Sequence, residues 1–240
     1  MKIGNLIDAF QPAKGAPPTT LAAFLQWCLS GAWPMLALAA AFSAIAGAME
    51  AGTAYILGLV IDTALESGPT QFFTLANVLV ILGALGFFLI LRPVLFGLSA
   101  ASNAIIVQPN VNPLVLSRLN RWTLGQSVRF FDDDFAGRIA QKQMQTASAV
   151  TSVATEVINV VAFALASLAG SMALLGAIDL RVTLLFVVWL VGYFALISWF
   201  LPRVRQRSGK RAGARATVSG QVVDTITNIK TVKLFAHAAH

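Results

Sequence analysis

Four long stretches of apolar residues dominate the chain, at about positions 34–61, 72–94, 149–178 and 182–201. A helix needs roughly 20 apolar residues to cross a bilayer. Each stretch is long enough to do so. The pattern therefore predicts an all-α integral membrane protein with four transmembrane helices.

A shorter apolar stretch, Leu21–Leu29, precedes them and is too short to span a membrane. Trp33 and Pro34 separate it from the first long stretch, because a residue before proline is disfavoured in helical geometry. We therefore expect a helix over 19–32 that lies in the membrane interface, after a cytoplasmic tail over 1–18. A cleaved signal peptide is the alternative, but no basic start is joined directly to a short apolar core.

The composition points to the same surroundings. Of the 240 residues, 57% are hydrophobic and 11% are charged, whereas soluble domains carry about 25% charged residues. A soluble fold of this size could not cover so much apolar surface, so the protein lies largely in lipid. The single cysteine, Cys28, excludes an internal disulfide framework and a cysteine-rich metal site.

The basic residues predict the orientation. The link over 62–71 has no Lys or Arg, whereas the link between the second and third stretches has five and the tail after Pro202 has eight. Because excess positive charge stays on the cytoplasmic side, both ends and the middle link are expected to be cytoplasmic. The prediction is a multi-pass protein of the plasma membrane, the bacterial inner membrane. This placement accounts for the net charge of +7 without a nucleic-acid partner.

The middle link is long and does not resemble a flexible linker. Apolar residues recur along it among the basic ones, at Leu114, Leu116, Leu119 and Trp122. This spacing predicts that the second helix continues into the cytoplasm, with Pro109 and Pro113 bending or breaking it locally. After the sequence RFFDDDFAG, a helix-prone stretch merges into the third apolar stretch. We therefore expect long cytoplasmic helix extensions, with coupling regions over 110–148 and 203–240.

Two short motifs carry a resemblance to a known family. RFFDDDFAG contains two aromatic residues, an acid and, about five residues on, a glycine; SGQVVDTITNIKTVKLFA contains a glycine, an acid and Val-Lys-x-Phe. In both motifs, and in their order after the second and fourth spans, the chain resembles the transmembrane domain of an ATP-binding cassette (ABC) exporter from about Leu21 onward. Lys142, Thr146 and Ala238 depart from the family pattern, which usually has an arginine, an aspartate and an acid there.

This resemblance implies that RFFDDDF, which we call the aromatic tip, is a coupling helix that docks on a nucleotide-binding domain. It also implies that the second motif begins another coupling helix. Exposed aromatic residues are also frequent anchors of protein interfaces. A calcium site is an alternative for the three aspartates, but the run lacks the ligand spacing of calcium loops. The residues implied to couple are Phe130, Phe131, Asp132, Asp133, Gly137, Val232, Lys233 and Phe235.

The resemblance also implies a function. Positions 33–240 would be part of one half of a homodimeric or heterodimeric exporter, which moves an amphipathic lipid or drug-like substrate by alternating access. The family has six spans per half and a nucleotide-binding domain that holds ATP and Mg²⁺. No G-x-x-x-x-G-K-[ST] loop occurs in this sequence, so we expect no cofactor in the chain and no ATP hydrolysis by it alone. The last two spans and the cassette are expected after His240.

Two other functions remain open at this stage. One is a peptide transporter of similar membrane architecture that has no cassette, and the other is a four-span scaffold that moves nothing. The scaffold predicts short loops, which the long extension before Phe130 disfavours.

Three charged residues, Glu50, Arg92 and Glu156, lie in or near the apolar stretches. An acidic residue at the centre of a span opposes membrane insertion by about 3 kcal/mol, whereas the apolar residues of the first stretch favour insertion by about 3–5 kcal/mol in total. Glu50 is therefore expected to face a wet cavity or a neighbouring helix. Each of the three is a candidate for the substrate path; the alternative is a polar contact between helices, or, for Arg92, a head group lying at the inner interface.

Overall fold

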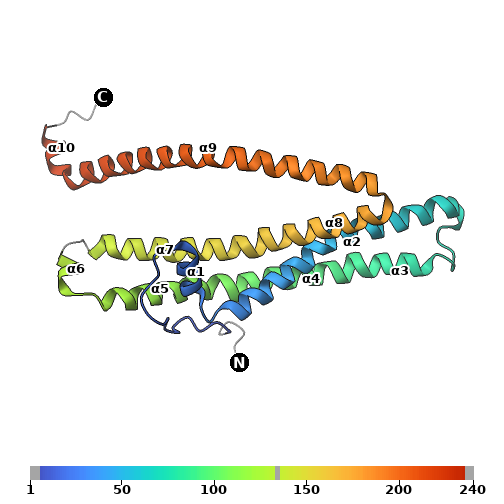
Figure 1. The fold of residues 1–240 in the computed structure, drawn as a ribbon, viewed down its shortest axis with the longest axis horizontal. Helices are drawn as coiled ribbons and strands as arrows, with labels where there is room; N and C mark the ends of the chain where they lie inside the picture. The colour runs from blue at the N-terminus through green and yellow to red at the C-terminus, as the bar shows by residue number, and fades with distance from the viewer. Residues whose placement is uncertain (1–5, 133–135, 236–240) are drawn as a thin grey trace. The chain divides into compact units, whose positions relative to one another are not determined.

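The structure is a computed structural model, and it describes residues 6–132 and 136–235. All elements of these residues are helical (Figure 1). The chain divides into two compact units, Met1–Ile178 and Asp179–His240. We describe each unit by itself.

In its described residues, the first unit contains two short helices, α1 and α6, and three long helical stretches. The helix α2 begins at Trp33 with Pro34 in its first turn, where the missing proline N–H costs nothing. It is interrupted near its end at Gly68, whose φ of 68° is open to glycine but disfavoured for other residues. The elements are α1 (Leu21–Leu29), α2 (Trp33–Gln71), α3 (Val78–Gly86), η2 (Phe87–Leu91), α4 (Arg92–Ala101), η3 (Ser102–Val107), α5 (Gln108–Leu124), α6 (Val128–Asp132), α7 (Ala136–Glu156), η4 (Val157–Ala162) and α8 (Phe163–Ile178).

The second and third long stretches are each continuous across several of these elements. The second stretch runs from α3 through α5 and contains the π-helical segments η2 and η3. The third stretch runs from α7 through α8 and contains the π-helical segment η4. The prolines do not break the helix. Pro109 lies in the first turn of α5, directly after the π-helical η3, and Pro113 lies inside α5. Long helical extensions therefore leave the apolar segments, as the sequence predicts.

Four helices of the described chain are long and apolar enough to cross a membrane: Trp33–Gly68, Val78–Leu124, Arg138–Ile178 and Leu180–Arg211. They contain the first, third and fourth predicted spans and extend beyond them. The second predicted span, 72–94, begins too early, because the helix starts at Val78. Large apolar side chains are exposed along their membrane parts; Leu79 is 80% exposed and Leu185 is 71% exposed. Such exposure is unfavourable in water and suits a helix that faces lipid.

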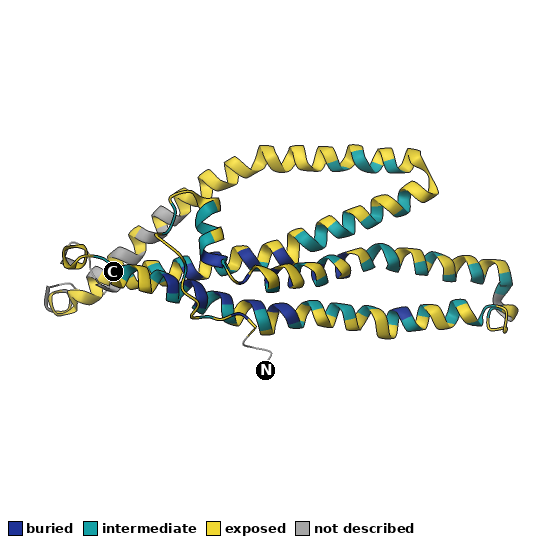
Figure 2. Cartoon of the chain, turned by 60° about the horizontal axis from the view of Figure 1, so that its bottom comes forward, coloured by how far each residue is buried: buried dark blue, intermediate teal, exposed yellow. Residues whose placement is uncertain are grey.

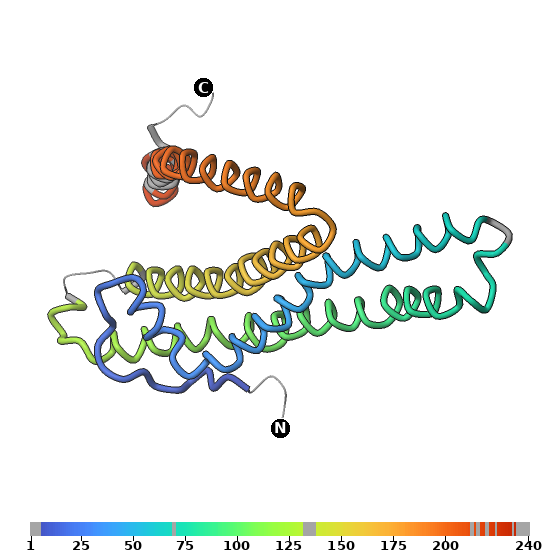
Figure 3. The backbone as a smooth tube through the Cα atoms, turned by 45° about the vertical axis from the view of Figure 1, so that its right-hand side comes forward, coloured from blue at the N-terminus to red at the C-terminus, as the bar shows by residue number. Residues whose placement is uncertain are grey.

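Helix α2 packs closely on α8, as the tube in Figure 3 shows. A Cβ atom added at Gly47 would lie 2.2 Å from the carbonyl oxygen of Phe163, and one at Gly170 would lie 3.0 Å from the Cβ of Ala51. Small residues thus let the two backbones touch, which is how helices associate in lipid without a hydrophobic driving force.

The buried residues of the first unit gather where α1, the start of α2, α5 and α7 meet (Figure 2). This core lies at one end of the apolar segments and not in their middle. Its most deeply buried members are Cys28, Ala32, Val107, Val111, Leu114, Val115 and Ala147.

The second unit is a long helix, α9 (Leu180–Thr227), followed by the short helix α10 (Ile229–Phe235). The Asp179 carboxylate begins α9 by accepting a hydrogen bond from the backbone N–H of Arg181, at 2.7 Å. Further along, the Arg203 guanidinium lies 3.7 Å from the centre of the Trp199 ring. An arginine on a tryptophan directly after an apolar segment is typical of a membrane–water interface.

Candidate functional site

The aromatic tip joins the ends of α5 and α7, which lie side by side (Figure 1). At this tip, α6 carries Phe130 and Phe131, whose rings pack edge to face with their centres 5.3 Å apart. Their side chains remain 42% and 37% exposed. Two adjacent aromatic rings that cannot bury themselves at the end of a hairpin form a surface suited to docking.

The tip is far from the apolar segments. Positions 136–148 of α7 lie before the third apolar stretch, which is about 20 Å at 1.5 Å per residue. Hydrogen bonds tie the two extensions together: Gln143 Nε2 donates to Thr123 Oγ1 at 2.7 Å, and Asn112 Nδ2 donates to Ser148 Oγ at 3.4 Å. These bonds hold the two helices together as a pair.

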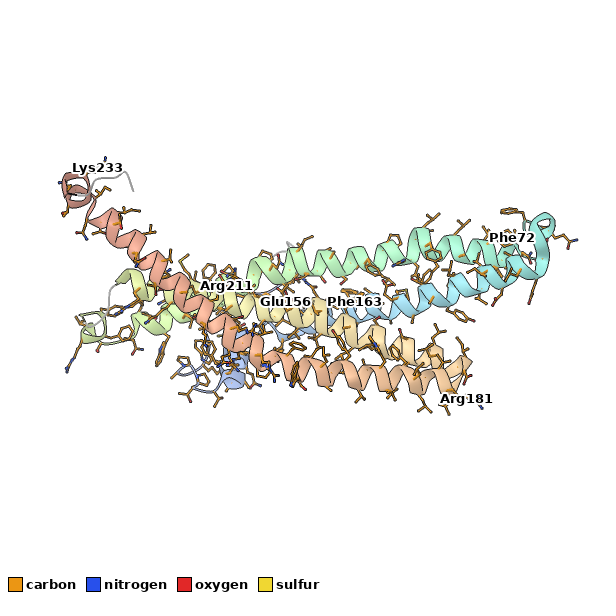
Figure 4. The ribbon with its side chains drawn as sticks, turned by 90° about the horizontal axis from the view of Figure 1, so that it is seen from above. Phe72, Glu156, Phe163, Arg181, Arg211 and Lys233 are labelled. Carbon is orange, nitrogen blue, oxygen red and sulfur yellow. The ribbon has the colours of Figure 1, made fainter. Side chains whose placement is uncertain are left out.

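The other predicted coupling residues are described less completely. Asp132 ends α6 and Gly137 lies in the first turn of α7, whereas Asp133 and Asp134 lie outside the described residues. Val232, Lys233 and Phe235 all belong to α10 in the second unit, and Lys233 is exposed (Figure 4). The coupling role of these residues stays a prediction.

Arg118 lies on α5 and is only 2% exposed. Its guanidinium donates to the carbonyl oxygens of Trp27 at 2.9 Å, Cys28 at 2.8 Å and Ser30 at 2.7 Å, and also to Ser30 Oγ at 3.0 Å. These are carbonyls that the C-terminal end of α1 leaves without helical partners. Arg118 therefore caps α1 and fixes it to α5.

The same arginine holds the segment before α1. Its Nε donates to the carbonyl oxygen of Gln11 at 3.1 Å, and the neighbouring Ser117 Oγ donates to that of Ala9 at 2.8 Å. Ile7 adds an apolar anchor and is 3% exposed. The segment from Ile7 to Gln11 is thus packed on α5, a contact that the sequence pattern does not indicate.

Burial in this region also affects the only cysteine. Cys28 is fully buried, and burial raises the pKa of its thiol to about 11, while the charge of Arg118 works in the opposite direction. The thiol is therefore protonated and unreactive at neutral pH.

Glu50 on α2 and Arg92 on α4 form an ion pair. The distance from Arg92 Nη2 to Glu50 Oε1 is 3.1 Å, and the two side chains are about one-third exposed. Arg92 also lies over the Phe96 ring, 5.4 Å from its centre. Pairing lowers the cost of both charges in an apolar segment. The sequence signals each charge alone, but not that residues 42 positions apart meet.

Glu156 belongs to a polar strip along the first unit, formed by two cavities of about 390 and 420 Å³ that share Gln108. The first cavity lies between α2, η3 and η4, and the second lies between α5 and α7. Figure 4 labels Glu156 and Phe163, which line the two cavities from one continuous helix. The principal polar residues of the strip are Ser43, Asn103, Gln108, Asn112, Thr155, Glu156 and Asn159.

Two features set this strip apart from an ordinary helix contact. Within the described part of the chain, the side-chain oxygens Asn103 Oδ1 and Thr155 Oγ1 are buried without a hydrogen-bond partner. Such groups are rare because each costs about 1–3 kcal/mol. In addition, η3 and η4 both contribute residues to the strip, and π-helical turns occur frequently at functional sites.

The described residues contain no group of three or more His, Cys, Asp or Glu side chains that could hold a metal ion. The sequence also lacks the phosphate-binding loop G-x-x-x-x-G-K-[ST].

Comparison with known proteins supplies the family. The family model for the ABC transporter transmembrane region matches residues 36–240. An uncharacterized ABC transporter ATP-binding protein from Haemophilus influenzae is 29% identical over 237 residues, which cover 97% of this chain. The match covers 38% of that relative's length, so the chain spans about two-fifths of the relative. No solved structure matches the chain.

Proposed function

Because the chain belongs to the ABC transporter transmembrane region family, we propose that it forms part of an exporter that moves an amphipathic substrate, a lipid or a drug-like compound, by alternating access. The chain itself is a multi-pass membrane protein without a nucleotide-binding domain. ATP and Mg²⁺ would act in a nucleotide-binding domain, supplied in the same polypeptide or by a partner. A second transmembrane half, identical or related, would complete the transporter.

The observation that carries this proposal is the aromatic tip. Phe130 and Phe131 are exposed at the end of a hairpin that is braced by hydrogen bonds between its two helices. The tip would dock in the nucleotide-binding domain, and α10 with Lys233 would form a second contact. Closure of the nucleotide-binding domains would then pull on both helices of the hairpin together.

The polar strip would line the substrate path in this mechanism. It offers amides and hydroxyls together with the Glu156 carboxylate, and it begins on the cytoplasmic extensions and ends between the apolar segments. Glu50 and Arg92, which neutralise each other, would contribute a polar contact beside this path. An amphipathic substrate could place its polar part on the strip while its apolar part remains in lipid.

Cross-linking at the tip tests the proposed coupling. Phe131→Cys is labelled with a thiol-reactive photo-cross-linker and mixed with a purified nucleotide-binding domain of the family. The native Cys28 does not interfere, because it is fully buried. We expect a covalent product that depends on light and on the cysteine at position 131.

Leu75→Cys is the matched control, since Leu75 is 90% exposed at the other end of the helices. It is expected to give no product, and a membrane-impermeant thiol reagent should label the two positions from opposite sides. Equal cross-linking at both positions, or labelling of position 131 from the outside, would refute both the docking surface and the orientation.

A further inference from the structure

A second surface of the first unit lies between α1, the start of α2 and the helix formed by α7 and η4. It consists of two cavities of about 480 and 280 Å³, which share Leu25 of α1 and Val153 of α7. We call this continuous surface the α1 groove. It is separate from the polar strip and from the aromatic tip.

The two ends of the α1 groove differ in polarity. One end contains Lys142, Gln145 and Thr146 of α7. The other end is lined by apolar side chains only, among them Leu36 of α2 and Val157 of η4. Of the described residues that line either cavity, Lys142 carries the only charge.

The dimensions fit one leaflet of a bilayer. Lys142 and Val157 are 15 positions apart on a continuous helix, which is about 22 Å at 1.5 Å per residue. Half of a bilayer, including its polar head groups, is about 20–22 Å thick. A groove with an ammonium group at one end and hydrocarbon for the rest of its length therefore has the layout of a single phospholipid molecule.

We propose that the α1 groove binds one anionic phospholipid, with its phosphate group beside Lys142 and an acyl chain along Val153 and Val157. The positive charge at the polar end selects an anionic head group over a zwitterionic one. The polar end is the end nearer α6, so in the orientation proposed above the lipid belongs to the cytoplasmic leaflet. Only this choice of leaflet rests on the proposed function.

The bound lipid would also support α1. This helix has only nine residues, and an isolated helix of that length is marginal in water. Arg118 fixes its C-terminal end, while Leu25 in its middle contacts the groove. A lipid in the groove would cover the apolar side of α1 and help to keep it packed on α5.

Native mass spectrometry of the purified, delipidated protein tests the site. The probes are phosphatidylglycerol and phosphatidylcholine with identical palmitoyl and oleoyl chains. We expect phosphatidylglycerol to bind about fivefold more tightly. Lys142→Gln should abolish this preference and Lys142→Arg should keep it, while Arg121→Gln, an exposed change on α5, should leave it unaltered.

Filling the apolar end tests the position of the acyl chain. Val157→Trp should weaken both lipids about tenfold, because the indole displaces at least two buried methylene groups. Val160→Trp is the matched control, since Val160 lies on the same η4 segment, is similarly exposed and does not line the groove. Ala37→Phe, at an exposed position that lines the apolar end, repeats the test if Val157→Trp does not fold.

Equal binding of the two lipids by the unmodified protein, or equal effects of the tryptophans at 157 and 160, would overturn the proposal. The cross-linking at position 131 does not involve the groove. Loss of lipid preference with intact cross-linking would thus reject the lipid site alone, and the reverse result would reject only the coupling role and the leaflet.

Discussion

Replacement of Arg118 by methionine should release α1 and the segment before it from α5. The substitution keeps an apolar stem of similar length but removes every donor that caps the end of α1. It leaves the carbonyl oxygens of Gln11, Trp27, Cys28 and Ser30 without their charged partner. A fully buried acceptor without a partner costs about 1–3 kcal/mol, and a half-buried one costs less because water can reach it.

The structure allows the size of this effect to be estimated. The bond to the Cys28 carbonyl is the buried one, whereas the other bonds are partly buried. Removing Arg118 also recovers the cost of burying a charge, so we expect a net loss of about 3 kcal/mol. That loss raises the population of the released state about 100-fold.

Cys28 is a built-in reporter of this release, because it is fully buried beneath the contact. A maleimide reacts with the thiol only when α1 has moved away, so the labelling rate follows the population of the open state. We expect Arg118→Met to raise the rate about 100-fold at pH 7 when the peptide that contains Cys28 is followed by mass spectrometry. Arg118→Lys should give an intermediate rate, because it restores some of the donors.

Arg121→Met is the control, since Arg121 is exposed on the same helix and should leave the rate unchanged. If Arg118→Met changes the labelling rate less than about threefold, the buried arginine contributes almost nothing to holding α1, and the hydrogen-bond argument is wrong.

Three further predictions concern packing, protonation and the ion pair. Gly47→Ala should destabilise the protein by about 1–3 kcal/mol, because the added Cβ would lie 2.2 Å from the carbonyl oxygen of Phe163 on α8. Gly58→Ala is the control and should not destabilise it, since a Cβ there meets nothing within 4 Å. Equal melting temperatures of the two variants would contradict the packing argument. Burial raises the pKa of the Cys28 thiol from 9.0 to about 11, so between these pH values the folded protein keeps a proton that the unfolded chain loses. The contribution of the thiol to the free energy of unfolding is therefore complete below pH 9 and is lost between pH 9 and 11. Cys28→Ala should lack this part of the decline in melting temperature, and identical pH profiles of the two proteins would refute the argument. Removal of either partner of the Glu50–Arg92 pair should cost more than removal of both, with a coupling energy of about 1 kcal/mol because the side chains are about one-third exposed. Additive losses in the double-mutant cycle would show that the two charges do not stabilise each other.

The helices could be predicted from the sequence because lipid imposes a simple rule on composition. A span must be apolar along its whole length, so hydropathy alone locates all four. The continuity of α5 through Pro113 was harder to predict, since a proline removes one helical hydrogen bond but does not by itself determine whether neighbouring packing holds the helix straight.

The contacts of Arg118 could not be predicted from the sequence. It is one of five basic residues in the middle link, and nothing in the local pattern distinguishes it from Arg121, which is exposed. The difference depends on α1 lying across α5, a contact between residues about 90 positions apart. The ion pair of Glu50 and Arg92 depends on tertiary packing in the same way.

The π-helical segments have a geometric consequence for the two halves of each long helix. A π turn closes over one more residue than an α turn, and one residue corresponds to about 100° of rotation around a helix axis. Segments η3 and η4 therefore set the rotational phase of α5 and α7 independently of the phase that α4 and α8 need toward lipid. Deleting a single residue from η3 would remove the extra residue that the wide turn accommodates and shift the sequence of α5 by one position relative to that of α4.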